Sequence, residues 1–412
     1  MAFDLSAASN VLKTHYIGPI REQLNGKTVL MSRIAKDVDS YSPTGKNFTV
    51  PLHTARNSSA AVGRADGGTL PTHGQQAYEN AVIPVAYLYG RIKVTGPTIR
   101  ASRDNVGAFV RALDSEIKGV TKDFKRGINR QAHSDGTDAL GFWTTADNSS
   151  GTDIDDSRGN GFVHLPTSGT LTCDLIDTDN ATKNGDSIVV TLGSISSTVA
   201  AITWTGTVSS SGDADYLVLE DSLGYQMMGL AGIVDDANPP LLSGGLHGLP
   251  VATKAFWKAQ ITEGDSAGTN QALTFARMQG VISKIATNSD FDESDIEFIL
   301  TSYEVKDKYA DLLVADKRFV NTLKLDGGFK GLDYNGIPVI ADPQCRKNRM
   351  YFVVPESLRV YRLMDFDWMD RDGSVFSRIA NEDAYEATLA VYQNLGTHAR
   401  NANGLLDDIA IG

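Results

Sequence analysis

Hydrophobic and polar positions alternate in two stretches near the start of the chain. From Asn47 the chain reads Asn-Phe-Thr-Val-Pro-Leu-His, with the alternation of a half-buried β-strand. Residues 82–94 again favour a strand, with valine and tyrosine recurring. Between them, residues 56–80 are rich in Ser, Ala, Gly and Thr and have no strong periodicity. This pattern predicts a long extended hairpin, and a polar stretch of this length is typical of an arm that contacts a partner.

The clearest predicted element is a long amphipathic helix that follows this hairpin. Asp104 is placed to act as its N-cap, and apolar residues then recur every three or four positions. They are Val106, Phe109, Val110, Leu113, Ile117, Val120, Phe124 and Ile128. Basic residues occupy much of the remaining surface, where a solvated face is favoured over a contact with nucleic acid. The stripe predicts one strut-like helix of about seven turns.

Composition changes in the middle of the chain. Residues 165–236 are dominated by Thr, Ser, Gly and Asp, with short strands predicted at 187–192 and 216–220 and a turn at Asn184-Gly185. This region is expected to form a small β-rich insertion.

The last part of the chain returns to a mixed α and β pattern. Thr274 is the expected N-cap of a helix that carries Phe275, Met278, Ile282 and Ile285. A strand at 296–301 leads into the box Thr301-Ser-Tyr-Glu304, which predicts the start of another helix. A tight turn at Asn335-Gly336 then precedes strands predicted at 337–341 and 350–354.

Composition limits the class of protein. The 412 residues provide for two or three subdomains, and 41% hydrophobic and 21% charged residues are ordinary values for a globular protein. No membrane segment and no secretory signal are expected. Cys173 and Cys345 are the only cysteines, which excludes a disulfide framework and fits a reducing cytoplasm. The net charge of −12 argues that any nucleic acid is contained and not gripped.

One motif suggests hydrolytic chemistry. Gly264-Asp-Ser266-Ala-Gly268 satisfies the GxSxG pattern by which hydrolases expose a nucleophilic serine between a strand and a helix. Residues 259–263 make a weak strand, residues 269–271 do not start a helix, and His398 is the only downstream histidine. A Gly/Ser linker is therefore favoured over a serine esterase that uses Ser266.

Metal and nucleotide motifs fail at defined positions. The seven histidines lack the i, i+4 spacing of a zinc-binding helix. Residues 153–159 begin like a calcium loop, but Arg158 replaces the required glycine and His164 the required glutamate. Gly26-Lys27-Thr28 lacks the earlier glycine of a phosphate-binding loop. We expect no catalytic, cofactor-binding or metal-binding residue.

The order of the predicted parts resembles the Hong Kong 97 fold of major capsid proteins from tailed bacteriophages, over most of the chain. Residues 87–102 look like the strand that returns from the family's extended loop towards its spine helix. Residues 331–342, 350–356 and 384–396 are similar to the ending of the family's peripheral domain. The resemblance implies an α+β capsid fold and a structural protein, not an enzyme.

The resemblance also implies a division of the chain. It would comprise an N-terminal arm (1–45), an extended loop (46–95), a peripheral domain with a spine helix near 104–134 (96–164), a β-rich insertion domain (165–236), a mainly axial domain (237–335) and the completion of the peripheral domain (336–412). The insertion exceeds the minimal fold. No acidic, helical N-terminal extension is visible, so a separate scaffolding protein is expected.

The function implied is self-assembly, through pentamers and hexamers, into an icosahedral shell that encloses double-stranded DNA. The expected location is the virion, after assembly in the cytoplasm of a host bacterium, with a portal and a possible cement or decoration protein as further partners. Alternatives are an encapsulin-like cellular compartment, which is usually shorter and lacks a large β insertion, the esterase, and a phage tail or adhesin protein. Some relatives of the capsid family cross-link a lysine of the extended loop to a neighbour's asparagine. Here no lysine occurs between Lys46 and Lys93, so a non-covalent shell is expected.

Overall fold

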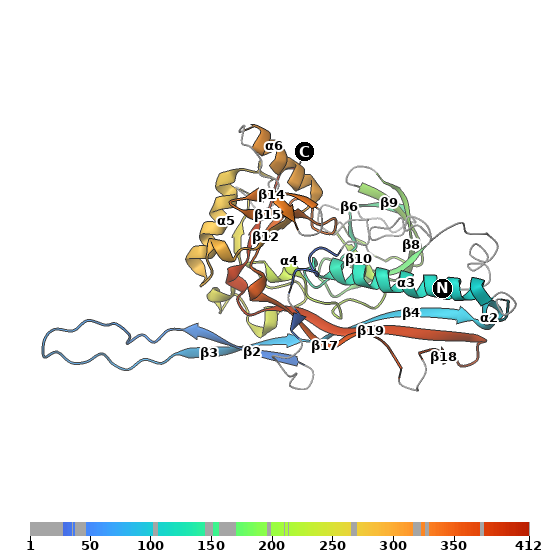
Figure 1. Cartoon of the computed structure of the whole chain (residues 1–412), viewed down its shortest axis with the longest axis horizontal. Coiled ribbons are helices and arrows are strands. Elements are labelled where there is room, and N and C mark those ends of the chain that lie inside the picture. The colour runs from blue at the N-terminus through green and yellow to red at the C-terminus, as the bar shows by residue number, and fades with distance from the viewer. Residues whose placement is uncertain are drawn as a thin grey trace.

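The protein is an elongated body from which one hairpin projects (Figure 1). The computed structural model describes residues 28–34, 36–37, 47–101, 106–144, 151–155, 170–195, 199–209, 211–212, 214–264, 270–315, 323–325, 329–370 and 375–411. Asp104 and Ser266 lie outside the described residues. None of the described helices combines the length and the apolar character that crossing a bilayer requires.

A five-stranded sheet runs along the long axis of the body (Figure 1). Its strands are β1 (Lys36–Asp37), β4 (Ala86–Thr95), β17 (Leu358–Trp368), β18 (Ser377–Arg378) and β19 (Ala384–Thr397). The path is β1-β17-β19-β18, and β4 pairs with β19 along its whole length, from Thr95 opposite Ala384 to Ala86 opposite Gln393. The sheet therefore joins a strand near the start of the chain to one near its end.

The long helix α3 (Val106–Gln131) covers one face of this sheet, after the short α2 (Gly96–Ala101) (Figure 1). Its position confirms the helix predicted near residues 104–134. Ile128 is buried, and the ring of Phe124 meets the ring of Phe366 edge-on at 5.5 Å. A Cβ atom added to Gly90 would lie 3.1 Å from the Phe124 ring. The glycine therefore lets helix and strand approach closely.

Buried polar groups fix the end of α3. The Asn129 amide donates to Asp342 Oδ2 at 3.1 Å, and His133 Nε2 lies at the same distance from that oxygen. Burial by itself raises the pKa of Asp342, but His133 and the donated hydrogen bonds outweigh it and lower that pKa. Arg130 pairs with Asp138 at 2.5 Å, also in the interior. These contacts tie the helix to the segment that follows β15.

A seven-stranded sheet forms the other half of the body, in the order β11-β20-β16-β12-β15-β14-β13. Its strands are β11 (Gln260–Thr262), β12 (Phe298–Thr301), β13 (Leu323–Leu325), β14 (Phe329–Tyr334), β15 (Ile337–Ala341), β16 (Met350–Val353) and β20 (Gly404–Leu406). The helices α5 (Phe275–Asn288) and α6 (Tyr303–Ala315) pack against it. Met278, Ile282 and Val305 are fully or almost fully buried in this core.

Local signals explain most of these boundaries. The Thr274 side chain caps α5 by accepting from the Arg277 N–H, as predicted. The turn at Asn335-Gly336 is also confirmed, with φ angles of 51° and 82°, as a two-residue hairpin requires. The box at Thr301 is wrong as a helix start. Thr301 ends β12, its hydroxyl donates to the Arg349 carbonyl oxygen at 2.7 Å, and the Ser302 hydroxyl accepts from the first turn of α6.

Six strands close into a small barrel in the order β10-β5-β6-β9-β8-β7. They are β5 (Gly141–Trp143), β6 (Gly151–Asp155), β7 (Leu171–Ile176), β8 (Lys183–Ile195), β9 (Val199–Thr205) and β10 (Tyr216–Leu219). β8 and β10 confirm the strands predicted at 187–192 and 216–220. The barrel also includes two strands that precede residue 165. The division of the chain into domains stays a prediction.

The turn predicted at Asn184-Gly185 is wrong, because both residues lie inside β8. The chain reverses earlier, between β7 and β8, where Asn180 has a φ of 60°. Asp179 accepts from the N–H groups of Ala181 and Thr182 at 2.8 Å. Side-chain carboxylates thus satisfy the turn's amides, so the Asn-Gly pair is not needed there.

The projecting hairpin consists of β2 (Asn47–Ala55) and β3 (Ala77–Pro84), which pair antiparallel. It confirms the hairpin predicted from the sequence. The strand predicted over 82–94 is divided at Val85 into β3, which belongs to the hairpin, and β4, which belongs to the body.

Short helices connect the barrel to the body. They are α4 (Leu230–Ile233), η2 (Leu246–Gly248) and η3 (Ala255–Trp257), with η4 (Glu293–Asp295), η5 (Pro355–Ser357) and η6 (Arg400–Ala402) elsewhere in the body. The fully buried Arg400 guanidinium holds this region together, because it donates to four backbone carbonyl oxygens. These belong to Gly232, Ile233, Ala237 and Trp257, at 2.7 to 3.3 Å. Burial lowers the pKa of Arg400 to about 10.

Candidate assembly surface

The inner face of the hairpin is anchored on the body. Phe48, Val50 and Ile83 are buried against Leu249 and Trp257 of the connecting segment. The rings of Phe48 and Tyr361 lie 5.5 Å apart. Each residue buried on this face that leaves water contributes about 25 cal/mol per Å² of apolar surface. The base of the hairpin is therefore held by the body.

Polar contacts fix the direction in which the hairpin leaves the body. Lys254 forms an ion pair with Glu79 of β3, and the Asn394 amide donates to the Pro84 carbonyl oxygen at 2.7 Å. Below them, the His247 ring lies 6.2 Å from the Trp257 ring and accepts at Nε2 from the Thr397 N–H at 3.2 Å. These contacts join β3 to η3 and to β19, so the hairpin and the long-axis sheet move as one unit.

The loop at the tip of the hairpin has local order of its own. Asn57 Oδ1 accepts from the Ser59 N–H at 2.8 Å, and the Asn57 amide donates to the Gly74 carbonyl oxygen at 3.0 Å. Any Cβ atom at Gly74 would lie within 2.4 Å of the Asn57 side chain, so glycine is required there. Farther out, Leu70 is 82% exposed. The tip presents its apolar residue to the outside of the molecule.

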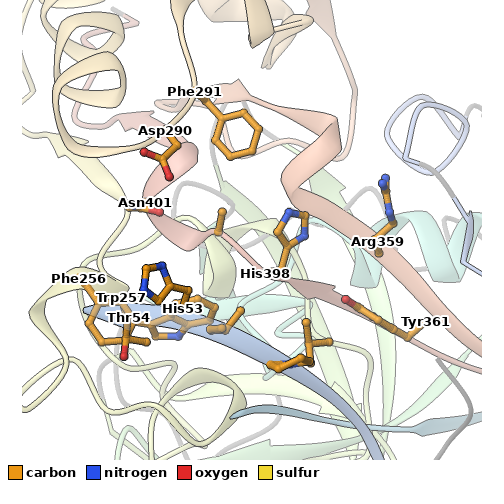
Figure 2. Close-up of a pocket in the computed structure, with 14 residues that line it drawn as sticks. His53, Thr54, Phe256, Trp257, Asp290, Phe291, Arg359, Tyr361, His398 and Asn401 are labelled. Carbon is orange, nitrogen blue, oxygen red and sulfur yellow. The ribbon is translucent and has the colours of Figure 1, made fainter. Parts of the chain in front are cut away.

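A groove of about 630 Å³ runs along the base of the hairpin (Figure 2). β2 lines one side with His53 and Thr54, and Phe291 and His398 face it from the body. At its outer end, Arg56 lies 3.9 Å from Asp290, and both side chains are almost fully exposed. An ion pair this exposed contributes little to stability. The groove is thus mainly a polar and aromatic recess.

The groove also contains the histidine of the esterase hypothesis. Burial, helped by the nearby Arg359 charge, lowers the pKa of His398. β11 ends at Thr262 and Gly264 is described, but Ser266 lies outside the described residues. The structure therefore does not test whether Ser266 and His398 meet, and the esterase stays a hypothesis.

The remaining predicted motifs do not gather at one site. Asp153 and Asp155 lie in β6, and residues 156–164 are outside the described part of the chain. Both cysteines are buried. Burial raises the pKa of Cys173 to about 12 and that of Cys345 further still. Neither thiol is poised as a nucleophile.

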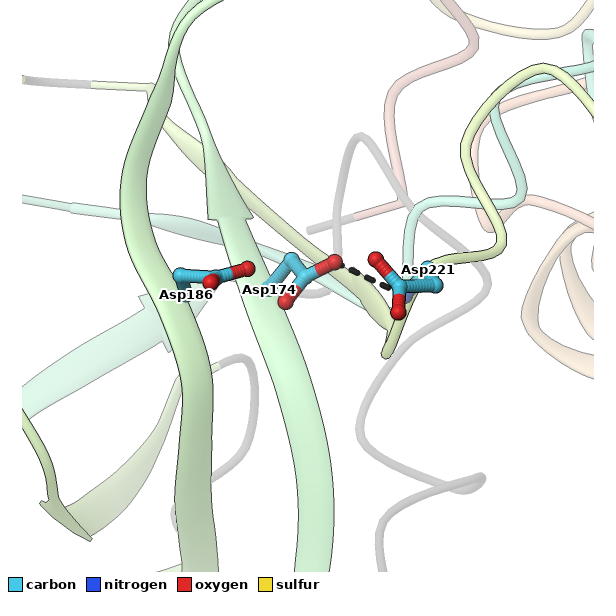
Figure 3. Close-up of side chains that lie close together, drawn as sticks. All are labelled: Asp174, Asp186 and Asp221. Atoms are coloured by element: carbon cyan, nitrogen blue, oxygen red, sulfur yellow. Dashed lines mark hydrogen bonds between the residues drawn. The ribbon is translucent and has the colours of Figure 1, made fainter.

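One acidic cluster was missed by sequence reasoning. Among the described residues, Asp174, Asp186 and Asp221 bring their carboxylates close enough to share a metal ion (Figure 3). The Lys183 ammonium, however, lies 2.9 to 3.0 Å from all three. Those carboxylates raise the pKa of Lys183 far above its ordinary value. The lysine supplies the positive charge that a metal would bring, so the cluster joins β7, β8 and the end of β10 as a structural contact.

The comparisons with known proteins concern the whole chain. The sequence matches no protein-family model and no curated protein. The capsid asymmetric unit of cyanophage A-1(L) matches in structure with a TM-score of 0.62 and 16% identity, over 96% of each chain. The capsid of a native GTA particle matches with a TM-score of 0.53 and 11% identity, over 96% of this chain and 95% of that one.

An encapsulin complex from Synechococcus elongatus also matches, over 100% of this chain and 97% of that one, with 8% identity. Its TM-score of 0.46 carries no argument. The two closer similarities cover the body, the hairpin and the barrel together. The chain has the α+β, Hong Kong 97-type fold of tailed-bacteriophage capsid proteins.

Proposed function

We propose that this protein is a structural shell subunit, the major capsid protein of a tailed bacteriophage. The observation that carries the proposal is the projecting hairpin. It is anchored on one face, it extends away from its own body, and it belongs to a fold shared with capsid subunits along almost the whole chain (Figure 1).

The physical argument concerns repetition. A shell built from many copies of one chain needs contacts that recur at every copy and tolerate small differences in angle. An arm that overlaps a neighbour adds buried surface far from the body's own contacts, so small apolar contributions accumulate over many copies. A rigid body with a protruding arm meets both requirements.

In the finer form of the proposal, subunits form pentamers and hexamers of an icosahedral shell around double-stranded DNA. A separate scaffolding protein, a portal and a possible cement protein would take part. Assembly would occur in the host bacterial cytoplasm, and the mature protein would reside in the virion. The net charge of −12 supports containment of DNA, because a basic lining would hold the phosphates. The role is structural and not enzymatic.

Electron microscopy of the purified protein tests the proposal. Closed icosahedral shells are the expected result, and a protein that remains monomeric at high concentration would contradict it. Nuclease-protected DNA inside particles from the native source distinguishes a phage capsid from an encapsulin-like compartment. Esterase assays of the wild type and Ser266→Ala complete the test, since a rate lost only in the variant would favour the hydrolase.

A further inference from the structure

The register of the hairpin decides which backbone groups face outward. Asn47 pairs with Pro84, and Pro51 pairs with Asn80. Proline has no N–H, so neither pair can exchange two hydrogen bonds, and both have the same parity along the strands. The backbone groups of Asn47, Thr49, Pro51 and His53 therefore point away from β3. Those of Tyr78, Asn80, Val82 and Pro84 likewise point away from β2.

Each free edge of the hairpin thus carries a proline at an outward position. β2 and β3 form a two-stranded sheet with no further strand among the described residues. A free edge with a full row of donors and acceptors invites another strand, and an outward proline removes one of the donors. Pro51 weakens this pairing on β2, and Pro84 weakens it on β3. The hairpin is poorly suited to binding a partner by strand addition.

The outer face of the hairpin has the opposite character. Thr49, Pro51, His53, Tyr78, Asn80 and Val82 lie on this face, opposite one another in pairs. Tyr78 is 68% exposed and Val82 36% exposed, and the His53 and Tyr78 rings lie 5.2 Å apart. None of the six is an acid, a lysine or an arginine. We define these six residues as the outer hairpin face.

Charge indicates what this face fits. Residues 47–84 carry Arg56, Arg64, Asp66 and Glu79, which balance, so the net charge of −12 resides in the rest of the chain. Nucleic acid requires basic groups that the outer hairpin face lacks. A basic partner would find no carboxylate there. An acidic body, such as that of a second copy, meets no like charge on this face, whereas two bodies facing each other would repel.

We infer that the outer hairpin face is the surface by which the hairpin docks on a second copy of this chain, face to body, while Pro51 and Pro84 disfavour pairing at its edges. Tyr78 and Val82 supply the apolar centre of the contact. The inference rests on the proposed shell function. It adds which face of the hairpin binds and why the edges do not.

The first test places a charge at the centre of the face. Tyr78→Glu should raise the apparent critical concentration for assembly by about tenfold or more, because docking would bury a carboxylate. Tyr78→Phe should assemble like the wild type. Tyr225→Glu is the matched control, since Tyr225 is 75% exposed on a turn after β10. Circular dichroism should show every variant folded, and light scattering with electron microscopy measures assembly.

The second test restores the missing donor. Pro51→Thr should leave the fold intact but produce fibrous or irregular aggregates that bind thioflavin T, alongside fewer closed shells. Wild-type behaviour of this variant would overturn the role of the edge. Normal assembly of Tyr78→Glu, or equal loss of assembly in Tyr225→Glu, would overturn the role of the face. A wild type that forms no shells would instead contradict the proposed function, and the inference with it.

Discussion

The barrel and the hairpin both extend from the body, but they are stabilised in different ways. The barrel closes on itself around its own core, where Trp143 and Trp204 lie 4.8 Å apart and Leu217 is fully buried. The hairpin has two strands, and its buried face packs on residues of the body. Two strands alone are marginal in water. A module with its own core can be carried without altering the body, whereas the hairpin depends on the body and keeps one face free.

A charge inside the barrel should have the largest effect. Ile202→Asp buries an unpaired carboxylate at a position that is 1% exposed, which costs several kcal/mol. We expect β7 to β10 to lose protection in hydrogen exchange while β12 and β16 keep theirs. Thr203→Asp, on the outward face of the same strand, should be neutral. Loss of protection throughout the chain would show that the barrel is not independent of the body.

Acid should loosen the base of the hairpin before it affects the barrel. Burial, followed by the Arg400 charge, lowers the pKa of His247 from 6.5 to about 3. The unfolded chain therefore binds this proton first, so the stabilisation is complete above pH 6.5 and is lost as pH falls from 6.5 towards 3. The effect should be on the order of a few kcal/mol.

Urea unfolding at pH 7 and pH 4.5 measures this effect, with hydrogen exchange to locate it. His247→Gln keeps an acceptor for the Thr397 N–H but does not titrate. Its stability should change less with pH than that of the wild type. An identical pH dependence in both proteins would show that His247 is not the responsible group.

Removing the tip should hardly change the subunit. Replacing residues 56–76 by Asn-Gly joins Ala55 to Ala77, which already pair across the hairpin. Only the exposed Arg56–Asp290 ion pair and the loop's own contacts are lost, so the free energy of unfolding should change by less than about 1 kcal/mol. Shells of this variant should dissociate at lower denaturant concentration. Equal shell stability would mean that the tip makes no useful contact between subunits.

Boiling in detergent and reductant should leave no covalent trace of assembly. Particles should release one band at the 44.3 kDa of the single chain, because the hairpin offers no lysine and arginine stays protonated. Lys93 lies in β4 and pairs with Glu382. A ladder of multimers with a lysine–asparagine bond between chains would contradict both the non-covalent mechanism and the extended-loop assignment.

The sequence by itself determined the elements whose signals are local. The α3 stripe, the Thr274 cap and the Asn335-Gly336 turn each depend on residues within a few positions of one another. The hairpin could also be predicted, because alternating strands flank a polar stretch. In each case the controlling interactions act within one or two turns of chain, so the neighbours in sequence are the neighbours in space.

Only the tertiary structure decided the roles of residues whose partners lie far away. Thr301 reads as a helix cap until β16 approaches and takes its hydroxyl. The pairing of β4 with β19 and the four carbonyl oxygens around Arg400 unite segments separated by much of the chain. The same holds for the prolines of the hairpin, whose outward placement depends on strand register. Register and long-range contacts follow from the packing of whole faces, which no short stretch of sequence specifies.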